Sequence, residues 1–137
     1  NLETMAVNLG IAPSVTFAGR IDNENIPALY ASADLMINPS TVDNMPISIL
    51  EAFASGVPVV STDVGGVPFI AENGRTALLV PARAPERMAE AMLELLLDQD
   101  KARRLAAAAS DEVKQYAWPV IREKWLSVYR AAVLAGD

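Results

Sequence analysis

Two acidic residues, Asp43 and Glu51, stand eight positions apart in a stretch where turn formers lead into a predicted helix. Pro46 lies in the first turn of that helix, where its missing N–H costs nothing because the first N–H groups have no intrahelical partner. The free N–H groups and the positive end of the helix dipole favour an anion such as phosphate. Glu51 lies further along the helix, within reach of neutral hydroxyl groups on the same ligand. The stretch therefore predicts an anion site flanked by two carboxylates.

Each of these residues also has an ordinary structural interpretation. Judged by spacing alone, Glu51 is a solvent-facing helix residue, since single surface acids are common. Asp43 is suited to shaping a turn with Asn44, because Asp side chains often hydrogen-bond the backbone two residues on. Gly65 and Gly66 form a turn with room for another backbone segment to approach closely. Residue spacing leaves the structural and the ligand-binding interpretations open.

The composition limits the class of protein. The chain has 137 residues, of which 52% are apolar, enough for one globular domain with a real core. Its net charge of −6 argues against a nucleic-acid or anionic-membrane partner, because both require clustered Lys and Arg. The absence of Cys and His excludes disulfides, thiolate catalysis, Cys/His zinc sites and His-based triads within the chain. No apolar run approaches the roughly 20 residues that span a bilayer, so no integral membrane segment is expected.

Short apolar runs alternate with helical patterns, which predicts an α/β fold with a doubly wound parallel sheet. Runs such as VPVV and ALLV suit strands that are buried on both faces. In such sheets ligands bind beyond the carboxyl ends of the strands, so the segments that follow the strands should gather at one edge.

The end of the chain carries three aromatic residues that are expected to be packing residues: Trp118, Trp125 and Tyr129. Strands are expected at residues 15–18, 35–38, 57–61 and 77–80, and helices at residues 2–9, 25–33, 46–55, 86–97, 101–115 and 119–133, with one helical turn at 67–71.

The sequence DNMPISILEAFASGVPVVSTDVGG, residues 43–66, resembles the nucleotide-sugar site of GT-B glycosyltransferases, specifically of glycosyltransferase family four (group 1). That family has a Glu, seven intervening residues and a second Glu, followed by a Gly-Pro-Val strand. The resemblance extends through almost the whole chain. It includes the segments VTFAGR, ALYASADLMINPS, GGVPFIAENGRTALLVP and YAWPVIREKWLSVYR.

The resemblance implies a role for each residue of the site. The first acid of the family contacts the hydroxyls of the transferred sugar and the second contacts the nucleotide ribose, which assigns these contacts to Asp43 and Glu51. Backbone N–H groups at the helix start meet the sugar or the diphosphate, and the segment after Gly19 borders the nucleobase. The implied donor-binding residues are Gly19, Arg20, Asn44, Met45, Pro46, Ile47 and Glu51, with Asp43 as the catalytic contact to the sugar.

One position departs from the family pattern. The first acid is usually Glu and here is Asp43, whose side chain is shorter by one methylene. Either the loop sits closer to the sugar, or the hydroxyl contact is weaker or runs through water. The departure therefore bears on the identity of the donor sugar and not on the fold.

For the whole protein, the resemblance implies a hexosyltransferase that uses a UDP- or GDP-linked sugar, retains the anomeric configuration and needs no metal or other cofactor. Residues 1–137 correspond to part of the Rossmann-like C-terminal, nucleotide-sugar-binding domain, truncated at its N-terminal strands, with terminal helices over about 101–137. The acceptor-binding N-terminal domain is missing, as are a Lys and an Arg that neutralise the diphosphate, so the chain alone is expected to be inactive. A cytoplasmic location is expected, with peripheral membrane contact through the missing domain.

Two alternatives remain open at this point. The departure at Asp43 and the missing cations also fit a non-catalytic nucleotide-sugar-binding or structural module of the same fold. A weaker alternative is an unrelated flavodoxin-like binding domain. Whichever holds, a truncated sheet would expose an unpaired strand edge, through which copies of the chain are expected to associate.

Overall fold

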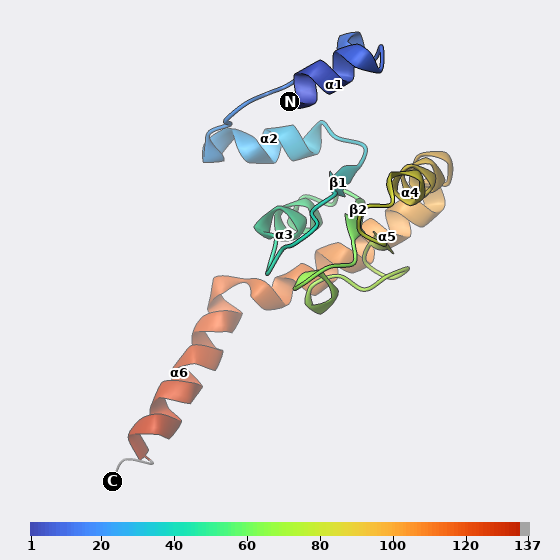
Figure 1. Ribbon diagram of the computed structural model, residues 1–137. Helices are drawn as coiled ribbons and strands as arrows, with labels where there is room; N and C mark the ends of the chain where they lie inside the picture. The colour runs from blue at the N-terminus through green and yellow to red at the C-terminus, as the bar shows by residue number, and fades with distance from the viewer. Residues whose placement is uncertain (135–137) are drawn as a thin grey trace.

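The computed structural model describes residues 1–134 and contains a sheet of three short parallel strands, two of which are labelled in Figure 1. These are β1 (Met36–Asn38), β2 (Val59–Thr62) and β3 (Leu78–Val80). They are hydrogen-bonded in sequence order, with Ile37 of β1 opposite Val60 of β2. The α/β fold with a parallel sheet, predicted from the alternation of apolar runs and helices, is confirmed.

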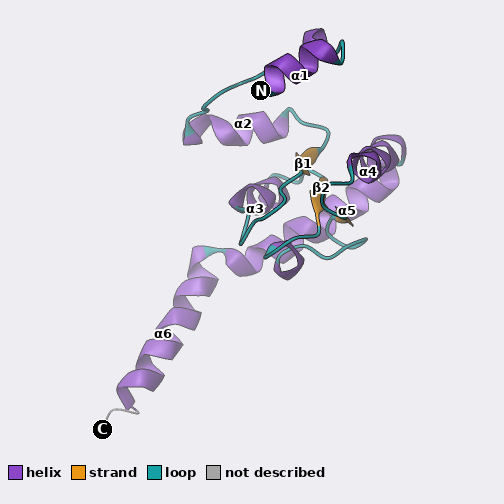
Figure 2. Cartoon of the chain, viewed as in Figure 1, coloured by secondary structure: helices purple, strands orange, loops and turns teal. Residues whose placement is uncertain are grey.

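Helices precede, connect and follow the strands (Figure 2). Their ends follow ordinary sequence signals: Pro85 opens one helix, and the Asp98 side chain caps the next by accepting a hydrogen bond from the Lys101 N–H. The α-helices are α1 (Leu2–Asn8), α2 (Ile26–Ala31), α3 (Ile47–Ala54), α4 (Pro85–Leu97), α5 (Gln99–Glu112) and α6 (Trp118–Leu134), and the short 3₁₀ helices are η1 (Ala12–Ser14), η2 (Asn23–Asn25), η3 (Val67–Phe69) and η4 (Val113–Tyr116).

Strand β2 is buried along its whole length because helices cover both faces of the sheet. Val59 belongs to a hydrophobic cluster with Phe53 of α3, and both side chains are fully buried. The next residue, Val60, belongs to a second cluster with Met88 and Leu95 of α4. Successive side chains of a strand point to opposite faces, so α3 and α4 cover opposite faces of the sheet. This is the doubly wound arrangement, and it leaves the strand ends free to carry the site.

Residues 15–18 do not form the strand that their β-branched and aromatic content predicts. Val15 has extended backbone angles, φ −118° and ψ 124°. A strand also needs a hydrogen-bonded neighbour, and in the described part of the chain the sheet consists of β1, β2 and β3 alone. Without a partner the segment stays irregular, and Phe17 is 47% exposed.

Helix α6 runs outward from η4, away from the rest of the molecule (Figure 1). Its aromatic residues Trp118, Trp125 and Tyr129 are 68%, 54% and 61% exposed. They belong to neither hydrophobic cluster of residues 1–134, because α6 does not fold back over the sheet, and their expected role as packing residues stays a prediction. Trp125 and Tyr129 instead stack on each other, with ring centroids 5.9 Å apart.

Candidate functional site

The loop that carries Asp43 rests directly on the turn at Gly65 and Gly66. The Gly66 N–H donates a hydrogen bond to the Asp43 carbonyl oxygen at 2.8 Å. A Cβ atom on Gly65 would lie 2.0 Å from that oxygen, and one on Gly66 would lie 1.4 Å from the carbonyl oxygen of Asn44. Any side chain at these positions would push the loop away, so the glycines set the position of Asp43. The close backbone approach expected at this turn is confirmed.

The Asp43 side chain is half-buried and helps to shape its own loop. Its Oδ1 atom accepts a hydrogen bond from the Met45 N–H at 3.1 Å. This is the short turn that Asp side chains favour, so the structural interpretation of Asp43 holds. The second carboxylate oxygen, Oδ2, accepts no hydrogen bond from residues 1–134 and is therefore available to a ligand.

Helix α3 begins immediately after this loop and its first turn is open. Pro46 takes the N-cap position with extended backbone, and no side chain caps the helix. The Ile49 N–H already donates to the Pro46 carbonyl oxygen at 3.1 Å, which leaves the N–H groups of Ile47 and Ser48, at the very start of the helix, available to an outside acceptor. Met45 and Ile47, on either side of Pro46, are 48% and 67% exposed. The start of α3 is therefore accessible to an anion, in line with the sequence pattern.

Glu51 lies further along α3, where this helix meets α2. The hydroxyl of Tyr30, from α2, lies 3.3 Å from Glu51 Oε2 and 3.1 Å from the carbonyl oxygen of Ser48, and it donates toward both acceptors. Burial and the negative charge of Glu51 raise the pKa of Tyr30, so its hydroxyl stays protonated at neutral pH. Beside this contact is a pocket of about 320 Å³ lined by Asn23, Ile26, Pro27, Tyr30, Glu51, Ala54 and Ser55.

Gly19 and Arg20, the residues expected beside a nucleobase, are exposed in the segment that leads to α2. Gly19 has φ +64°, a conformation that suits glycine. Neither residue lines the pocket beside Glu51, which Asn23 of η2 reaches instead. The structure thus places residues 43–47 at the start of α3 and Glu51 within α3, while Gly19 and Arg20 lie in the exposed segment that leads to α2.

Tyr30 and Asn23 are site residues that sequence reasoning did not identify. Tyr30 stands in a short apolar run, NIPALYASA, whose pattern predicts packing and nothing more. The available signal is its hydroxyl, since a tyrosine on a packed helix face usually finds a hydrogen-bond partner. Asn23 carries no such signal, because its place beside Glu51 depends on how η2 and α2 sit against α3.

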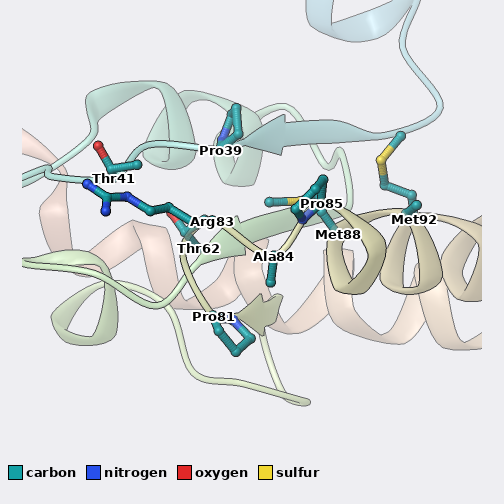
Figure 3. Close-up of a pocket in the computed structure, with 10 residues that line it drawn as sticks. Pro39, Thr41, Thr62, Pro81, Arg83, Ala84, Pro85, Met88 and Met92 are labelled. Atoms are coloured by element: carbon teal, nitrogen blue, oxygen red, sulfur yellow. The ribbon is translucent and has the colours of Figure 1, made fainter.

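A second pocket, of about 240 Å³, opens on the α4 side of the sheet (Figure 3). Like the Asp43 loop, it lies at the carboxyl ends of the strands, where Thr62 ends β2. Figure 3 shows the Arg83 side chain directed toward Thr41. Arg83 has φ 59°, which is unusual for a residue other than glycine. The lining residues are Pro39, Thr41, Thr62, Pro81, Arg83, Ala84, Pro85, Met88, Ala89 and Met92.

Two further findings concern residues 1–134. No three His, Cys, Asp or Glu side chains of this part of the chain lie close enough together to hold a metal ion. None of its helices combines the length and the apolar character needed to cross a membrane.

The sequence matches the model of one protein family over most of its length. The model of the family described as "Glycosyl transferases group 1" matches residues 1–112, which include the three strands, the Asp43 loop and α3. The chain belongs to this family.

Individual relatives cover the chain almost completely. The chain is 35% identical over 131 residues to the GDP-mannose-dependent alpha-(1-6)-phosphatidylinositol monomannoside mannosyltransferase of Mycobacterium tuberculosis (strain CDC 1551 / Oshkosh). That match covers 90% of this chain and 34% of the relative. The chain therefore spans about one third of the length of this curated relative.

Solved structures share the fold. Sucrose-phosphate synthase from Thermosynechococcus elongatus superposes with a TM-score of 0.91 at 30% identity, covering 98% of this chain and 34% of that one. Anabaena HepE in complex with UDP superposes with a TM-score of 0.87 at 25% identity, covering 96% of this chain and 36% of that one. In both cases the chain corresponds to about one third of a longer protein.

Proposed function

We propose that the chain is the donor-binding part of a glycosyltransferase that uses a nucleotide-activated sugar. The observation that carries the proposal is the open start of α3, which the turn at Gly65 and Gly66 holds beside the half-buried Asp43 carboxylate. In this assignment the first turn of α3 receives the diphosphate and Asp43 accepts hydrogen bonds from the sugar. Glu51 accepts hydrogen bonds from the ribose, and the segment with Gly19 and Arg20 borders the nucleobase.

The comparisons support this donor class. The name of the mycobacterial relative specifies GDP-mannose, and the Anabaena structure contains UDP. A diphosphate is the kind of anion that an uncapped helix N-terminus stabilises, and carboxylates suit vicinal hydroxyls because charge-assisted hydrogen bonds are about twice as strong as neutral ones. The proposed donor is accordingly a UDP- or GDP-linked hexose.

In the proposed reaction, the bond between the anomeric carbon and the diphosphate breaks while an acceptor hydroxyl bonds to that carbon with retention of configuration. The nucleoside diphosphate leaves with the electron pair of the broken bond, and its departing phosphate oxygen takes up the proton that the acceptor hydroxyl loses. This chain contributes by holding the donor in a fixed orientation and by stabilising negative charge on the leaving diphosphate at the start of α3. No metal or other cofactor is assigned a role.

Substitution of the two carboxylates tests the assignment in the complete polypeptide that contains this chain. We expect Glu51→Gln to weaken binding of GDP or UDP about 10-fold, because a hydrogen bond to a charged group is replaced by one to a neutral amide. Asp43→Asn should leave binding of the free nucleotide nearly unchanged and reduce transfer at least about 10-fold, because Asp43 contacts only the sugar. Isothermal titration with the nucleotides and a sugar-transfer assay measure the two effects. Equal effects of both substitutions on GDP or UDP binding would contradict the division of roles.

The 137-residue chain by itself should bind a nucleotide weakly and transfer no sugar. It spans about one third of its mycobacterial relative, and the acceptor is proposed to bind elsewhere in the longer protein. The test is a transfer assay with the purified chain, GDP- and UDP-linked hexoses and an acceptor mixture. Detectable transfer would show that the donor part also holds the acceptor.

One observation favours a second candidate, a nucleotide-sugar-binding module without catalysis. Asp43 already accepts the Met45 N–H, and this position carries Asp where the family pattern has Glu. A carboxylate occupied by its own turn contributes less to holding a sugar. Binding of UDP, GDP or their sugars by the complete polypeptide, with no transfer to a broad acceptor panel, would favour this candidate.

A further inference from the structure

A tyrosine hydroxyl joins helix α2 to the proposed ribose-binding carboxylate. The Tyr30 hydroxyl lies 3.1 Å from the Ser48 carbonyl oxygen and 3.3 Å from Glu51 Oε2. The ring of Tyr30 is partly buried against the hydrophobic cluster that contains Phe53. The hydroxyl is therefore fixed from two directions, by packing of its ring and by the backbone of α3.

The two distances indicate that one proton is shared between two acceptors. Both exceed the usual 2.7–2.8 Å of an O–H···O hydrogen bond, as expected when a single hydroxyl donates toward two oxygens at once. The Ser48 carbonyl belongs to the helix backbone and cannot move independently. The Glu51 carboxylate, by contrast, sits on a side chain with three torsions and is exposed. The contact therefore restricts Glu51 more than it restricts Tyr30.

We propose that Tyr30 is a positioning residue, whose hydroxyl holds the Glu51 carboxylate in the orientation that accepts hydrogen bonds from the ribose hydroxyls of a nucleoside diphosphate sugar. Contact at Oε2 leaves Oε1 without a hydrogen bond to residues 1–134, and so available to the ligand. This inference rests on the proposed function, because it takes Glu51 as the ribose contact. Tyr30 itself is not assigned a contact with the sugar or the diphosphate.

A purely structural role for Tyr30 makes a different prediction. If its ring only packs α2 against α3, removal of the hydroxyl changes the stability of the chain but not its selectivity among nucleotides. If the hydroxyl orients Glu51, removal specifically weakens the part of binding that depends on ribose hydroxyls. The variant Tyr30→Phe separates these cases because it keeps the ring and deletes the hydroxyl.

The experiment compares nucleotides with and without ribose hydroxyls. The complete polypeptide is titrated calorimetrically with GDP, UDP and their 2′,3′-dideoxy counterparts, and the ratio of the two dissociation constants is taken for the base that binds. We expect the natural protein to prefer the ribose form about 10-fold, Glu51→Gln to remove most of this preference, and Tyr30→Phe to reduce it about threefold. In the Glu51→Gln background, Tyr30→Phe should cause no further loss, since the group that it orients is already replaced.

Tyr116→Phe is the matched control. The Tyr116 hydroxyl also donates to a backbone carbonyl, that of Phe69 at 3.3 Å, and its ring packs on the same cluster, but no carboxylate in residues 1–134 accepts from it. This variant should keep the natural preference for ribose hydroxyls. An unchanged preference in Tyr30→Phe would overturn the inference alone, whereas a natural protein that binds neither nucleotide, or ignores the ribose hydroxyls, would overturn the ribose assignment and the inference with it.

Discussion

Tyr30 and Tyr116 connect the main hydrophobic cluster to hydrogen-bond acceptors at its rim. Tyr30 reaches α3 from α2, and Tyr116 reaches the Phe69 carbonyl from η4. Burial is the main cause that raises the pKa of both hydroxyls, and the nearby charges of Glu51 and Glu112, respectively, raise them further. Each phenol is therefore more easily deprotonated in the unfolded chain than in the folded one.

This difference predicts a loss of stability in alkali. The unfolded hydroxyls titrate near pH 10.0, below the folded ones, so the unfolded chain binds fewer protons between the two values. The free energy of unfolding should be insensitive to these groups below pH 10 and should fall as the pH rises through the folded pKa values. Urea unfolding at a series of pH values measures this fall in the free energy of unfolding. The double variant Tyr30→Phe/Tyr116→Phe should show a shallower fall. An unchanged slope of unfolding free energy against pH would mean that these two hydroxyls do not cause the loss of stability.

At the scale of elements, the contact between the Asp43 loop and the Gly65–Gly66 turn links the end of β1 to the end of β2. The contact is made by backbone atoms on both sides. Gly66 has φ −87°, an ordinary value, so what requires glycine there is the nearness of Asn44 and not the backbone conformation. Mutation can therefore distinguish a steric requirement for glycine from a conformational requirement for glycine.

Gly66→Ala should destabilise the chain by about 3 kcal/mol and should reduce nucleotide binding more than stability alone explains, because its Cβ displaces the loop. Gly56→Ala is the matched control: Gly56 has φ +70°, but a Cβ added there would meet no atom within 4 Å, so the substitution costs only about 1–2 kcal/mol of conformational strain. Urea unfolding and nucleotide titration of both variants provide the comparison. If the two alanines had equal effects on binding, the loop would not depend on this contact.

The sequence predicted the α-helices and three of the strands because their signals are local. Runs such as PVV and LLV carry β-branched and aliphatic residues, and Pro46 marks the start of α3. Residues 15–18 carry the same local signal, yet a strand also requires a neighbour, which local sequence does not report. The pairing of Tyr30 with Glu51 was missed for a related reason, since it depends on the placement of α2 against α3.

At the scale of the whole molecule, two of the apolar surfaces that residues 1–134 leave exposed bear on association between copies. One is the free edge of β1, whose paired neighbour in the described sheet is β2 and whose Ile37 is 42% exposed. The other is the face of α6 with Trp118, Trp125 and Tyr129. Either surface can promote contact between copies of the isolated chain, but an unpaired edge also offers backbone hydrogen bonds.

We expect the purified chain to associate in a concentration-dependent manner through the edge of β1. Ile37→Lys, which places a charge on that edge, should shift the population toward monomer, whereas Trp125→Ser on α6 should have the smaller effect. Size-exclusion chromatography with light scattering measures the mass of each variant. A monomer at high concentration for the natural sequence would contradict the expectation, and a larger shift with Trp125→Ser would move the contact to α6.

The support beneath the Asp43 loop also has a consequence for redesign of donor preference. Because the support is backbone against backbone, the side chains of Val42 and Met45, which are 82% and 48% exposed, contribute nothing to holding the loop through that contact. Both side chains can therefore be exchanged without changing the backbone contact that positions the loop. A library that randomises these two positions while keeping Gly65 and Gly66 should yield mostly folded proteins, so that differences in sugar choice among its members arise from the ligand contacts themselves.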